Sequence, residues 1–401
     1  MKTQEHGRRR FLKEGATLAG MALGVGAVRS ASGQTPQSEI SAEEILAYGK
    51  RSRFVGSARV PAPGLPRVWL NPLQDSAGII TPSGLFFVNT HFDIPDIDPR
   101  RHRLLIHGMV ERPLFFSVAE LKRLPFVSRI HFVDCVTNGS DRRDVSKTVQ
   151  HSHGRFGCSE WTGVPLSLLL KETGLQQGAR WVVAESADSG QWQRCIPLEK
   201  ALDDCMVAYG QNGEPLRPEQ GFPLRFLVPG WEGNINLKWL KRIKVVDVPY
   251  LEMPPKQPVS GHWEFEQQVA SVITVPSGGQ RLAGRGFFEI TGLAWSGAGA
   301  VRRVEISTDG GRNWKDAQLQ NPVLPKAATR FLFPWNWGGE AALLQSRATD
   351  DAGNVQPTLA ALSQTRGVSL DHWRSHNLPT HTGAVQSWEV TRDGNVEKIY
   401  A

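Results

Sequence analysis

The sequence predicts an α+β fold in two parts: a mixed α/β domain followed by an immunoglobulin-like β-sandwich domain. Its 401 residues are enough for two or three domains, each with its own hydrophobic core. Strand-like and short helical segments alternate up to about residue 250, whereas strand-like segments separated by glycine-rich turns follow residue 280. The 40 glycines, 26 prolines and 13 tryptophans are typical of a turn-rich, strand-rich protein rather than a helical bundle.

Residues 1–32 have the three parts of an export signal: a basic start, an apolar stretch at 16–28 and small residues at 30–32. The motif Arg-Arg-Arg-Phe-Leu-Lys at 8–13 resembles the twin-arginine motif, which directs a folded protein to the periplasm. A general secretory leader is the alternative. Because a membrane-spanning helix needs about 20 apolar residues, we expect a twin-arginine signal peptide and no membrane anchor. Export after folding is typical of proteins that receive a complex cofactor in the cytoplasm, so the leader indicates a redox enzyme.

Residues 33–80 are predicted to form a solvent-exposed N-terminal arm, with a helix-start signal at 41–44 and a proline-rich stretch at 61–66. The formal net charge of +7 is concentrated in the leader, and no long run of lysine or arginine occurs elsewhere. We therefore expect no nucleic-acid partner.

The first domain is predicted over residues 81–250. Its expected elements, in chain order, are strands at 104–109 and 114–117, a short helix begun by the capping box Ser117-Val-Ala-Glu120, a strand at 130–134, helices at 165–173 and after Pro197, a strand at 206–209, a hairpin turn at 211–214 and a strand at 224–228. Pro165 favours a helix start and Gly174 favours a helix end, which limits the helix between them.

The second domain is predicted over residues 251–369. A proline- and glycine-rich stretch at 247–280 indicates a linker region. The expected strands of the sandwich are 287–295, 301–307, 330–333 and 343–349. Residues 370–401 are predicted to be a C-terminal tail.

The four cysteines, Cys135, Cys158, Cys195 and Cys205, form no Cys-x-x-Cys pair. This spacing excludes zinc ribbons, ferredoxin-type clusters and the usual covalent attachment of a c-type haem. Electrons from any redox reaction must therefore pass to a haem or another carrier on a separate chain.

Six segments match one known family in their order along the chain. They are Thr-Pro-Ser-Gly-Leu-Phe-Phe-Val-Asn-Thr-His at 81–91, Asp-Cys-Val-Thr-Asn-Gly at 134–139, Cys-Ser-Glu-Trp-Thr-Gly at 158–163, Gly-Phe-Pro-Leu-Arg at 221–225, Val-Pro-Gly-Trp-Glu-Gly-Asn-Ile-Asn-Leu-Lys-Trp at 228–239 and Val-Glu-Ile-Ser-Thr-Asp-Gly-Gly at 304–311. Together they resemble the sulfite oxidase family of molybdopterin enzymes, and within it most closely the sulfane dehydrogenase (sulfite dehydrogenase) branch. The resemblance implies a molybdopterin-binding domain of sulfite oxidase type, followed by an immunoglobulin-like dimerisation domain.

Cys135 is the expected metal ligand. A molybdenum centre needs a soft, anionic protein ligand, and thiolate is the softest side chain available. Cys135 follows a strand and precedes the flexible loop 136–139, and the ligand of the resembled family falls at this position. The alternative is a buried free thiol, which is also the expectation for the other three cysteines unless two of them form a disulfide.

Five further residues are expected to bind the cofactor. A pterin that ends in a phosphate needs cations and N–H donors around it. The resemblance assigns this role to Arg225 and Lys238, and it assigns contacts with the pterin to His91, to Asp188 through a looser local match, and to Asn236.

The substrate side departs from the resembled family. Its sulfite-oxidising members hold their oxyanion with two arginines, and the matching positions here are Asn89 and Asn336. The substrate-side tyrosine of the family falls within residues 255–266, where this chain has none. Because a charge-assisted hydrogen bond is about twice as strong as a neutral one, free sulfite is expected to bind poorly. Arg142 or Arg143 is a candidate replacement cation; a solvated arginine pair is the alternative.

The resemblance implies oxygen-atom transfer to a sulfur-centred substrate, either sulfane sulfur or sulfite, free or bound to a carrier. Electrons are then expected to leave singly to a c-type cytochrome subunit, with this chain as a homodimer inside a heterocomplex. Two alternatives remain: a periplasmic reductase of small S-oxides or N-oxides, and a non-catalytic exported β-sandwich binding module in which Cys135 is structural.

Overall fold

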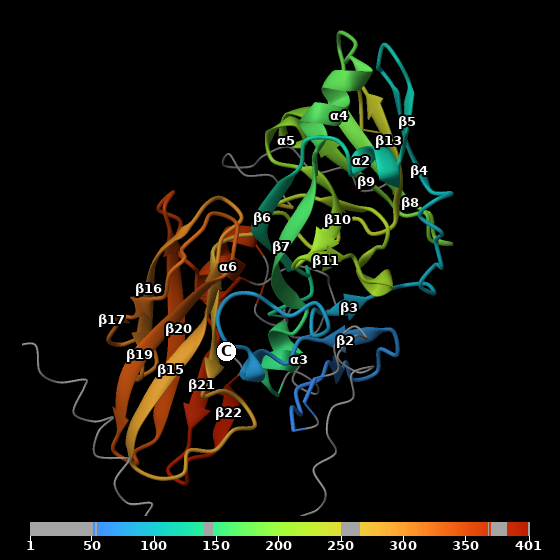
Figure 1. The fold of residues 1–401 in the computed structure, drawn as a ribbon. Coiled ribbons are helices and arrows are strands. Elements are labelled where there is room, and N and C mark those ends of the chain that lie inside the picture. The colour runs from blue at the N-terminus through green and yellow to red at the C-terminus, as the bar shows by residue number, and fades with distance from the viewer. Residues whose placement is uncertain are drawn as a thin grey trace, which may run out of the picture. The chain divides into compact units, whose positions relative to one another are not determined.

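The computed structural model describes residues 51–52, 54–139, 147–249, 265–367, 369 and 383–399. The chain divides into two units, 1–56 and 57–401. The first unit is described only at 51–52 and 54–56, and the elements discussed below belong to the second (Figure 1). No helix within the described residues has the length and apolar character of a membrane span.

The second unit begins with a small antiparallel sheet. It contains β1 (Val60–Pro61), β2 (Val68–Leu70) and β3 (Val88–Asn89), and the 3₁₀ helix η1 (Leu73–Asp75) follows β2. The prediction of an exposed arm is wrong for residues 68–73, because Leu70 and Leu73 are each only 1% exposed and enter the core. The proline-rich turn between β1 and β2 is largely exposed, and the described residues at 51–52 and 54–56 are exposed, as expected of an arm. Residues 33–50 lie outside the described residues.

Two five-stranded sheets form the rest of the first domain. One has the order β11-β10-β7-β6, with β12 paired to β10, and comprises β6 (Val127–Asp134), β7 (Phe156–Pro165), β10 (Met206–Gln211), β11 (Glu214–Pro215) and β12 (Arg225–Leu227). The other has the order β5-β4-β13-β8-β9 and comprises β4 (Arg103–Gly108), β5 (Leu114–Ser117), β8 (Trp181–Ser186), β9 (Gln193–Pro197) and β13 (Leu240–Val246). The intervening helices are α2 (Val118–Leu121), α3 (Val149–His153), α4 (Leu166–Thr173), α5 (Leu198–Asp203) and the 3₁₀ helix η2 (Pro218–Gln220).

Several limits of these elements follow from local side chains, as predicted. The Ser117 hydroxyl accepts a hydrogen bond from the backbone of Glu120, whose carboxylate accepts one from the Ser117 N–H. This is the expected capping box of α2. Helix α4 follows Pro165 and ends at Gly174. The residues between β10 and β11 form the expected hairpin turn.

The second domain is a sandwich of two sheets. One has the order β14-β15-β19-β18 and comprises β14 (Ala270–Val275), β15 (Gly286–Trp295), β18 (Gln318–Leu319) and β19 (Thr329–Trp337). The other has the order β17-β16-β20-β21-β22 and comprises β16 (Val301–Ser307), β17 (Lys315–Asp316), β20 (Ala342–Asp350), β21 (Ser387–Val390) and β22 (Val396–Ile399). The four strands predicted here are confirmed, as is the fold class of α+β followed by a β-sandwich.

Two boundaries differ from the prediction. Strand β14 lies inside the stretch 247–280 that was expected to be a linker, because its apolar side chains are buried in the sandwich core. The described end of the chain, 383–399, is not a separate tail: β21 pairs with β20, and β22 pairs with β21. Helix α6 (Leu359–Arg366) precedes these two strands and was not predicted.

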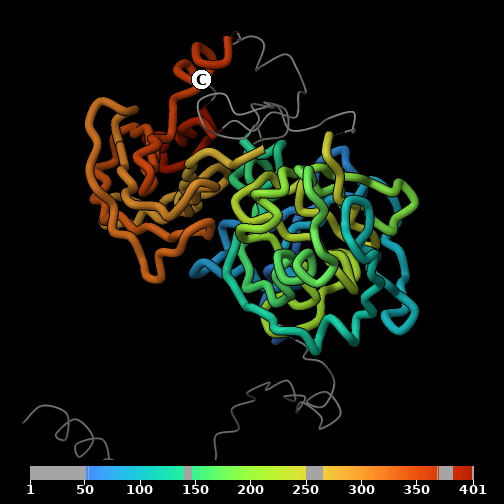
Figure 2. The backbone as a smooth tube through the Cα atoms, turned by 90° about the horizontal axis from the view of Figure 1, so that it is seen from above, coloured from blue at the N-terminus to red at the C-terminus, as the bar shows by residue number. Residues whose placement is uncertain are grey.

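The two domains of the second unit share a continuous apolar core. Phe156 of β7 packs against Trp295 at the end of β15, with ring centroids 4.4 Å apart, and both belong to one buried cluster that also contains Phe132 of β6. Seen from above, the orange and red sandwich lies beside the blue-to-yellow first domain (Figure 2). The loop that carries Cys135 therefore starts next to the sandwich.

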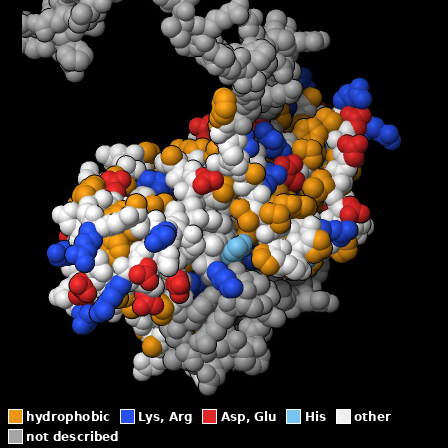
Figure 3. All heavy atoms as spheres, turned by 90° about the horizontal axis from the view of Figure 1, so that it is seen from below, with side chains coloured by type: hydrophobic (Ala, Val, Ile, Leu, Met, Phe, Trp, Pro, Cys, Tyr) orange, Lys and Arg blue, Asp and Glu red, His pale blue; other side chains and the backbone are white. Residues whose placement is uncertain are grey.

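On the face shown in Figure 3, lysine and arginine side chains are interspersed with aspartate and glutamate.

Candidate active site

A cavity of about 120 Å³ lies in the first domain and brings most of the predicted site residues together. Its lining comes from four parts of the chain: residues 87–91, Cys135, the β8–β9 region at 186–194, and the segment 220–239. Strand pairing contributes to this arrangement. Strand β12, which carries Arg225, pairs with β10 in one sheet, and β13, which directly follows the segment 220–239, pairs with β8 in the other.

Cys135 presents its thiol to this cavity. The residue directly follows β6 and is 6% exposed. Its backbone is held on both sides, since its N–H donates to the Arg155 carbonyl at 3.0 Å and its carbonyl accepts from the Asn138 N–H at 2.9 Å. The Thr137 hydroxyl lies 3.3 Å from Sγ, and the Asn89 amide nitrogen lies 3.8 Å from it. The thiol is thus fixed in place yet reachable from the cavity.

The other three cysteines have a different environment. All four cysteines are free thiols, so the alternative of a disulfide is not observed. Burial raises the pKa of Cys158 to about 12 and that of Cys195 to about 12, and it raises the pKa of Cys205 as well. Cys135 alone among them lines the cavity.

Arg225 and Lys238 bring two cations to the cavity wall. Arg225 is 3% exposed on β12, and its guanidinium lies 5.0 Å from the centroid of the Trp161 ring. Its Nη1 donates to the backbone and side-chain oxygens of Gln220, while its buried Nε has no hydrogen-bond partner among the described residues. Lys238 Nζ donates to the carbonyls of Asn89 and Glu219 at 2.9 and 3.2 Å. Burial, and then the charge of Arg225, lowers the pKa of Lys238 to about 7.

This pair of cations fits an anionic group. Burying a charge is costly unless an opposite charge compensates it, yet the partners shown for Arg225 and Lys238 are neutral oxygens. The unpartnered Arg225 Nε is a further donor for a bound oxyanion. A phosphate of the cofactor would supply both the charge and the acceptors.

His91, Asp188 and Arg194 line the same cavity. The rings of His91 and Trp192 are 4.9 Å apart. Partial burial, and then the positive charges of Arg194 and Lys238, lowers the pKa of His91. Asp188 is 6% exposed and accepts a hydrogen bond from the Ser186 hydroxyl. At neutral pH this wall therefore presents a neutral imidazole beside the carboxyl group of Asp188 and the guanidinium of Arg194.

Sequence reasoning missed Arg194. It lies on β9 and is tied by Nε to the Asn234 carbonyl at 2.8 Å, and its guanidinium is 4.8 Å from the centroid of the Trp192 ring. No motif marks it, because the β8–β9 pairing and the contact with the segment 233–238 bring it to the cavity. The sequence signal was limited to its position two residues after Trp192.

Of the two further asparagines predicted at the site, Asn236 is found at the cavity and Asn336 is not. Asn236 lines the cavity, but its side chain holds its own loop: Oδ1 accepts from the Val228 N–H, and Nδ2 donates to the carbonyls of Trp231 and Glu232. Asn336 is not brought to the cavity.

The placement of Asn336 follows from strand geometry. Side chains alternate between the two faces of a strand, and the flanking Trp335 and Trp337 are buried at 9% and 5% exposure. Asn336 therefore projects outward, opposite Phe287 of β15. Arg142 and Arg143, the candidate replacement cations, lie outside the described residues, as does most of the segment 255–266.

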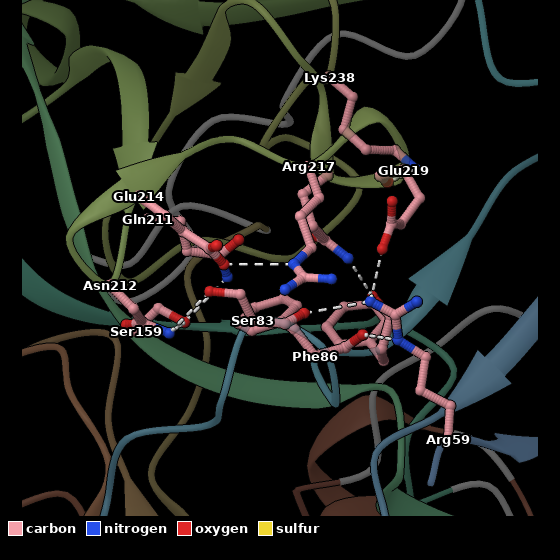
Figure 4. Close-up of polar contacts among 12 residues, drawn as sticks. Arg59, Ser83, Phe86, Ser159, Gln211, Asn212, Glu214, Arg217, Glu219 and Lys238 are labelled. Carbon is pink, nitrogen blue, oxygen red and sulfur yellow. Dashed lines mark hydrogen bonds and ion pairs between the residues drawn. The ribbon is translucent and has the colours of Figure 1, made fainter. Parts of the chain in front are cut away.

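A hydrogen-bond network joins the chain at Ser83 and Phe86, just before the lining residues 87–91, to Glu219 in the segment 217–221 (Figure 4). Arg59 donates to the carbonyls of Phe86 and Ser83, and it pairs with the Glu219 carboxylate at 2.7 Å. Lys238 in turn donates to the backbone of Glu219. The segment that leads to Asn89 and His91 is thereby fixed against the segment 217–221.

Comparison with known proteins agrees with this arrangement. Residues 91–253 match the family described as oxidoreductase molybdopterin binding domain, and residues 262–381 match the Mo-co oxidoreductase dimerisation domain. Human mitochondrial sulfite oxidase (Homo sapiens) is 31% identical over 336 residues, which cover 73% of this chain and 60% of that protein. The NADH nitrate reductase of Solanum lycopersicum is 31% identical over 331 residues, 70% of this chain and 36% of that protein.

The chain thus spans about three fifths of the length of the sulfite oxidases that it matches. A solved structure covers more of it. The crystal structure of the sulfane dehydrogenase SoxCD from Paracoccus pantotrophus is 35% identical and aligns with a TM-score of 0.80, covering 92% of this chain and 98% of that chain.

The chain belongs to the sulfite oxidase family of molybdopterin oxidoreductases. It is a molybdopterin oxidoreductase, and molybdenum-molybdopterin is its cofactor. Cys135 is the residue of the cavity suited to ligate the metal, and Arg225 and Lys238 are suited to hold the phosphate.

Proposed function

We propose that this enzyme oxidises a sulfur-centred substrate in the periplasm and passes the electrons to a c-type cytochrome. The observation that carries the proposal is that the Cys135 thiol and the cations Arg225 and Lys238 line one cavity. A soft ligand and a phosphate site in the same cavity suit a molybdopterin cofactor. When bound, that cofactor supplies two-electron oxidation coupled to oxygen-atom transfer.

The chain itself contributes binding and orientation. Cys135 holds the metal, while the backbone bonds on both sides of it limit its movement. Lys238 and Arg225 compensate the phosphate charge, and the His91 ring, tilted against the Trp192 ring, lines the cavity at the segment 87–91. These contacts fix the reacting centre in one orientation, which lowers the entropic cost of the reaction.

The substrate side supports sulfane sulfur over free sulfite. Asn89 places a neutral amide 3.8 Å from the Cys135 sulfur, where sulfite-oxidising relatives are expected to have a cation. A neutral donor binds an oxyanion more weakly than an arginine does. A carrier-bound sulfane sulfur brings less charge to the metal and needs no such arginine.

The proposals of export to the periplasm and of a cytochrome as electron acceptor are based on the sequence. The Arg-Arg-Arg-Phe-Leu-Lys motif at 8–13 supports twin-arginine export to the periplasm. The given sequence contains no Cys-x-x-Cys-His haem motif, which favours a c-type haem on a separate chain as the electron acceptor. A homodimer with attached cytochrome subunits is the assembly that we propose.

Co-purification from the periplasm of the native cell tests this function. Anaerobic addition of a persulfide or thiosulfate to the isolated complex is expected to reduce an attached c-type haem, seen in its visible spectrum, whereas sulfite acts more slowly. Reduction by sulfite alone would contradict the substrate preference. A complex that contains molybdenum but shows no haem reduction with any of these compounds would contradict the proposed function.

A further inference from the structure

Asp134, the residue before Cys135, is the point at which several segments meet. It is 0% exposed. Its Oδ1 accepts from the Asn138 side-chain amide at 2.6 Å, and its Oδ2 accepts from the Trp295 indole N–H at 3.1 Å. Its backbone carbonyl accepts from the Gly233 N–H at 2.6 Å and from the Gln267 side-chain amide at 3.1 Å.

Two of these donors belong to the second domain. Trp295 is the last residue of β15 and is 1% exposed against Phe156. Gln267 lies just before β14, where its N–H donates to the Gly230 carbonyl and its own carbonyl accepts from Gly297. The sandwich therefore contacts both the loop that carries Cys135 and the loop 228–239 that carries Lys238.

The other two donors belong to the site itself. Asn138 closes the turn that begins at Cys135, because its N–H also donates to the Cys135 carbonyl and its Oδ1 accepts from the Arg155 N–H. Gly233 lines the cavity. Asp134 thus joins the loop that carries Cys135, the loop 228–239 and the sandwich domain.

We propose that Asp134 is a positioning residue through which the sandwich domain fixes the Cys135 sulfur. The inference rests on the proposed role of Cys135 as the metal ligand. A carboxyl group suits this position because its two oxygens accept from two donors at once. An amide would turn its own NH₂ group towards one of the two donors.

Trp295→Phe is the most selective test, because it removes the N–H donor and keeps an aromatic ring. The chain offers a matched control in Trp388→Phe. Trp388 on β21 is 0% exposed, and its indole nitrogen has no hydrogen-bond partner among the described residues. Both variants lose similar buried volume, but only Trp295→Phe loses a bond to Asp134.

The first measurement uses full-length protein made without cofactor. The reaction of its thiols with an aromatic disulfide reagent reports on Cys135, since all four cysteines are buried but Cys135 alone among them lines the cavity. We expect Trp295→Phe to change this rate about tenfold, as for the loss of one hydrogen bond to a charged group. Trp388→Phe is expected to leave it within about twofold.

The second measurement uses the molybdenum-loaded enzyme. Trp295→Phe is expected to lower kcat about tenfold with little change in KM, because the substrate-binding surface is intact while the metal ligand is displaced. If Trp295→Phe fails to fold, Asp134→Asn carries the same test. Equal thiol rates and equal kcat in Trp295→Phe and Trp388→Phe would overturn the inference. Wild-type protein without molybdenum, together with a changed thiol rate in Trp295→Phe, would contradict only the proposed function.

Discussion

Arg225 and Lys238 place two basic groups in one cavity. Their proximity and burial destabilise the folded protein as long as no cofactor is bound. An unfolded chain keeps the proton of Lys238 up to about pH 10, whereas the folded protein releases it near pH 7 because burial lowers its pKa to about 7. Above pH 7 the unfolded chain therefore binds more protons, so the free energy of unfolding rises with pH.

We expect cofactor-free protein to gain at most about 2 kcal/mol of stability between about pH 7 and pH 8.5 through this residue. Urea denaturation of the wild type and of Lys238→Met at both pH values measures the effect. The gain should disappear in Lys238→Met, because methionine keeps the side-chain length without the charge. The same pH dependence in both proteins would contradict the lowered pKa of Lys238.

Asn89 determines the charge next to the metal ligand. Asn89→Arg would bring a cation to the part of the cavity wall where the Asn89 amide nitrogen lies 3.8 Å from the Cys135 sulfur. We expect the KM for sulfite to fall about tenfold or more, since a hydrogen bond to a charged group contributes about 1.5–3 kcal/mol. Steady-state kinetics at low and high salt measures this, and the gain should weaken with salt.

Asn336→Arg is the matched control for Asn89→Arg. Asn336 is exposed on β19 and does not line the cavity, so its KM for sulfite is expected to equal that of the wild type. A lower KM for sulfite in Asn336→Arg but not in Asn89→Arg would show that Asn336, and not Asn89, lies beside the bound substrate.

At the scale of elements, the sequence predicted what local chemistry determines. The capping box at Ser117 and the limits of α4 depend on a few neighbouring residues. Strand β14 was missed because its apolar run lies among prolines and glycines, and only the sandwich core shows that it is buried. Helix α6 carried a signal that was overlooked: the Thr358 hydroxyl accepts from the Ala361 N–H, and Gly367 ends the helix.

The loop 228–239 depends on close contact with the sandwich at Gly230. A Cβ at Gly230 would lie 2.4 Å from the Gly297 carbonyl oxygen, and its φ is +79°. We expect Gly230→Ala to destabilise the protein by clearly more than the roughly 1–2 kcal/mol of left-handed backbone strain alone, and to lower the molybdenum content.

Gly213→Ala is the control for the backbone strain. Gly213 has a similar φ of +77°, and nothing lies within 4 Å of a Cβ placed there. Urea denaturation midpoints and metal analysis of both variants compare strain with and without the clash. Equal destabilisation would show that the contact between Gly230 and the sandwich is unimportant.

At the scale of the whole molecule, the site was only partly predictable. Cys135, Arg225 and Lys238 lie in motifs, and the cavity brings them together. Arg194 and the outward position of Asn336 depend on strand pairing across the fold, which no local pattern shows. The contact of Trp295 with Asp134 joins residues 161 positions apart, so it was likewise invisible in the sequence.

The second domain is expected to make the assembly dimeric. Residues 262–381 match the dimerisation domain of the family, and two-fold symmetry is the commonest closed arrangement of identical chains. Light scattering of the isolated chain at micromolar concentration is expected to give twice the mass of one chain, without any cytochrome present. A monomer under these conditions would contradict the expectation.

X-ray absorption at the molybdenum edge tests most directly whether Cys135 binds the metal in this cavity. We expect wild-type protein to hold about one molybdenum per chain, and Cys135→Ser to fold, keep the pterin and lose turnover, because a hard, protonated hydroxyl replaces a soft thiolate. Its spectrum should show one sulfur neighbour fewer than that of the wild type, whereas Cys195→Ser, a buried thiol away from the cavity, should match the wild type. The same number of sulfur neighbours in Cys135→Ser and the wild type would contradict the account.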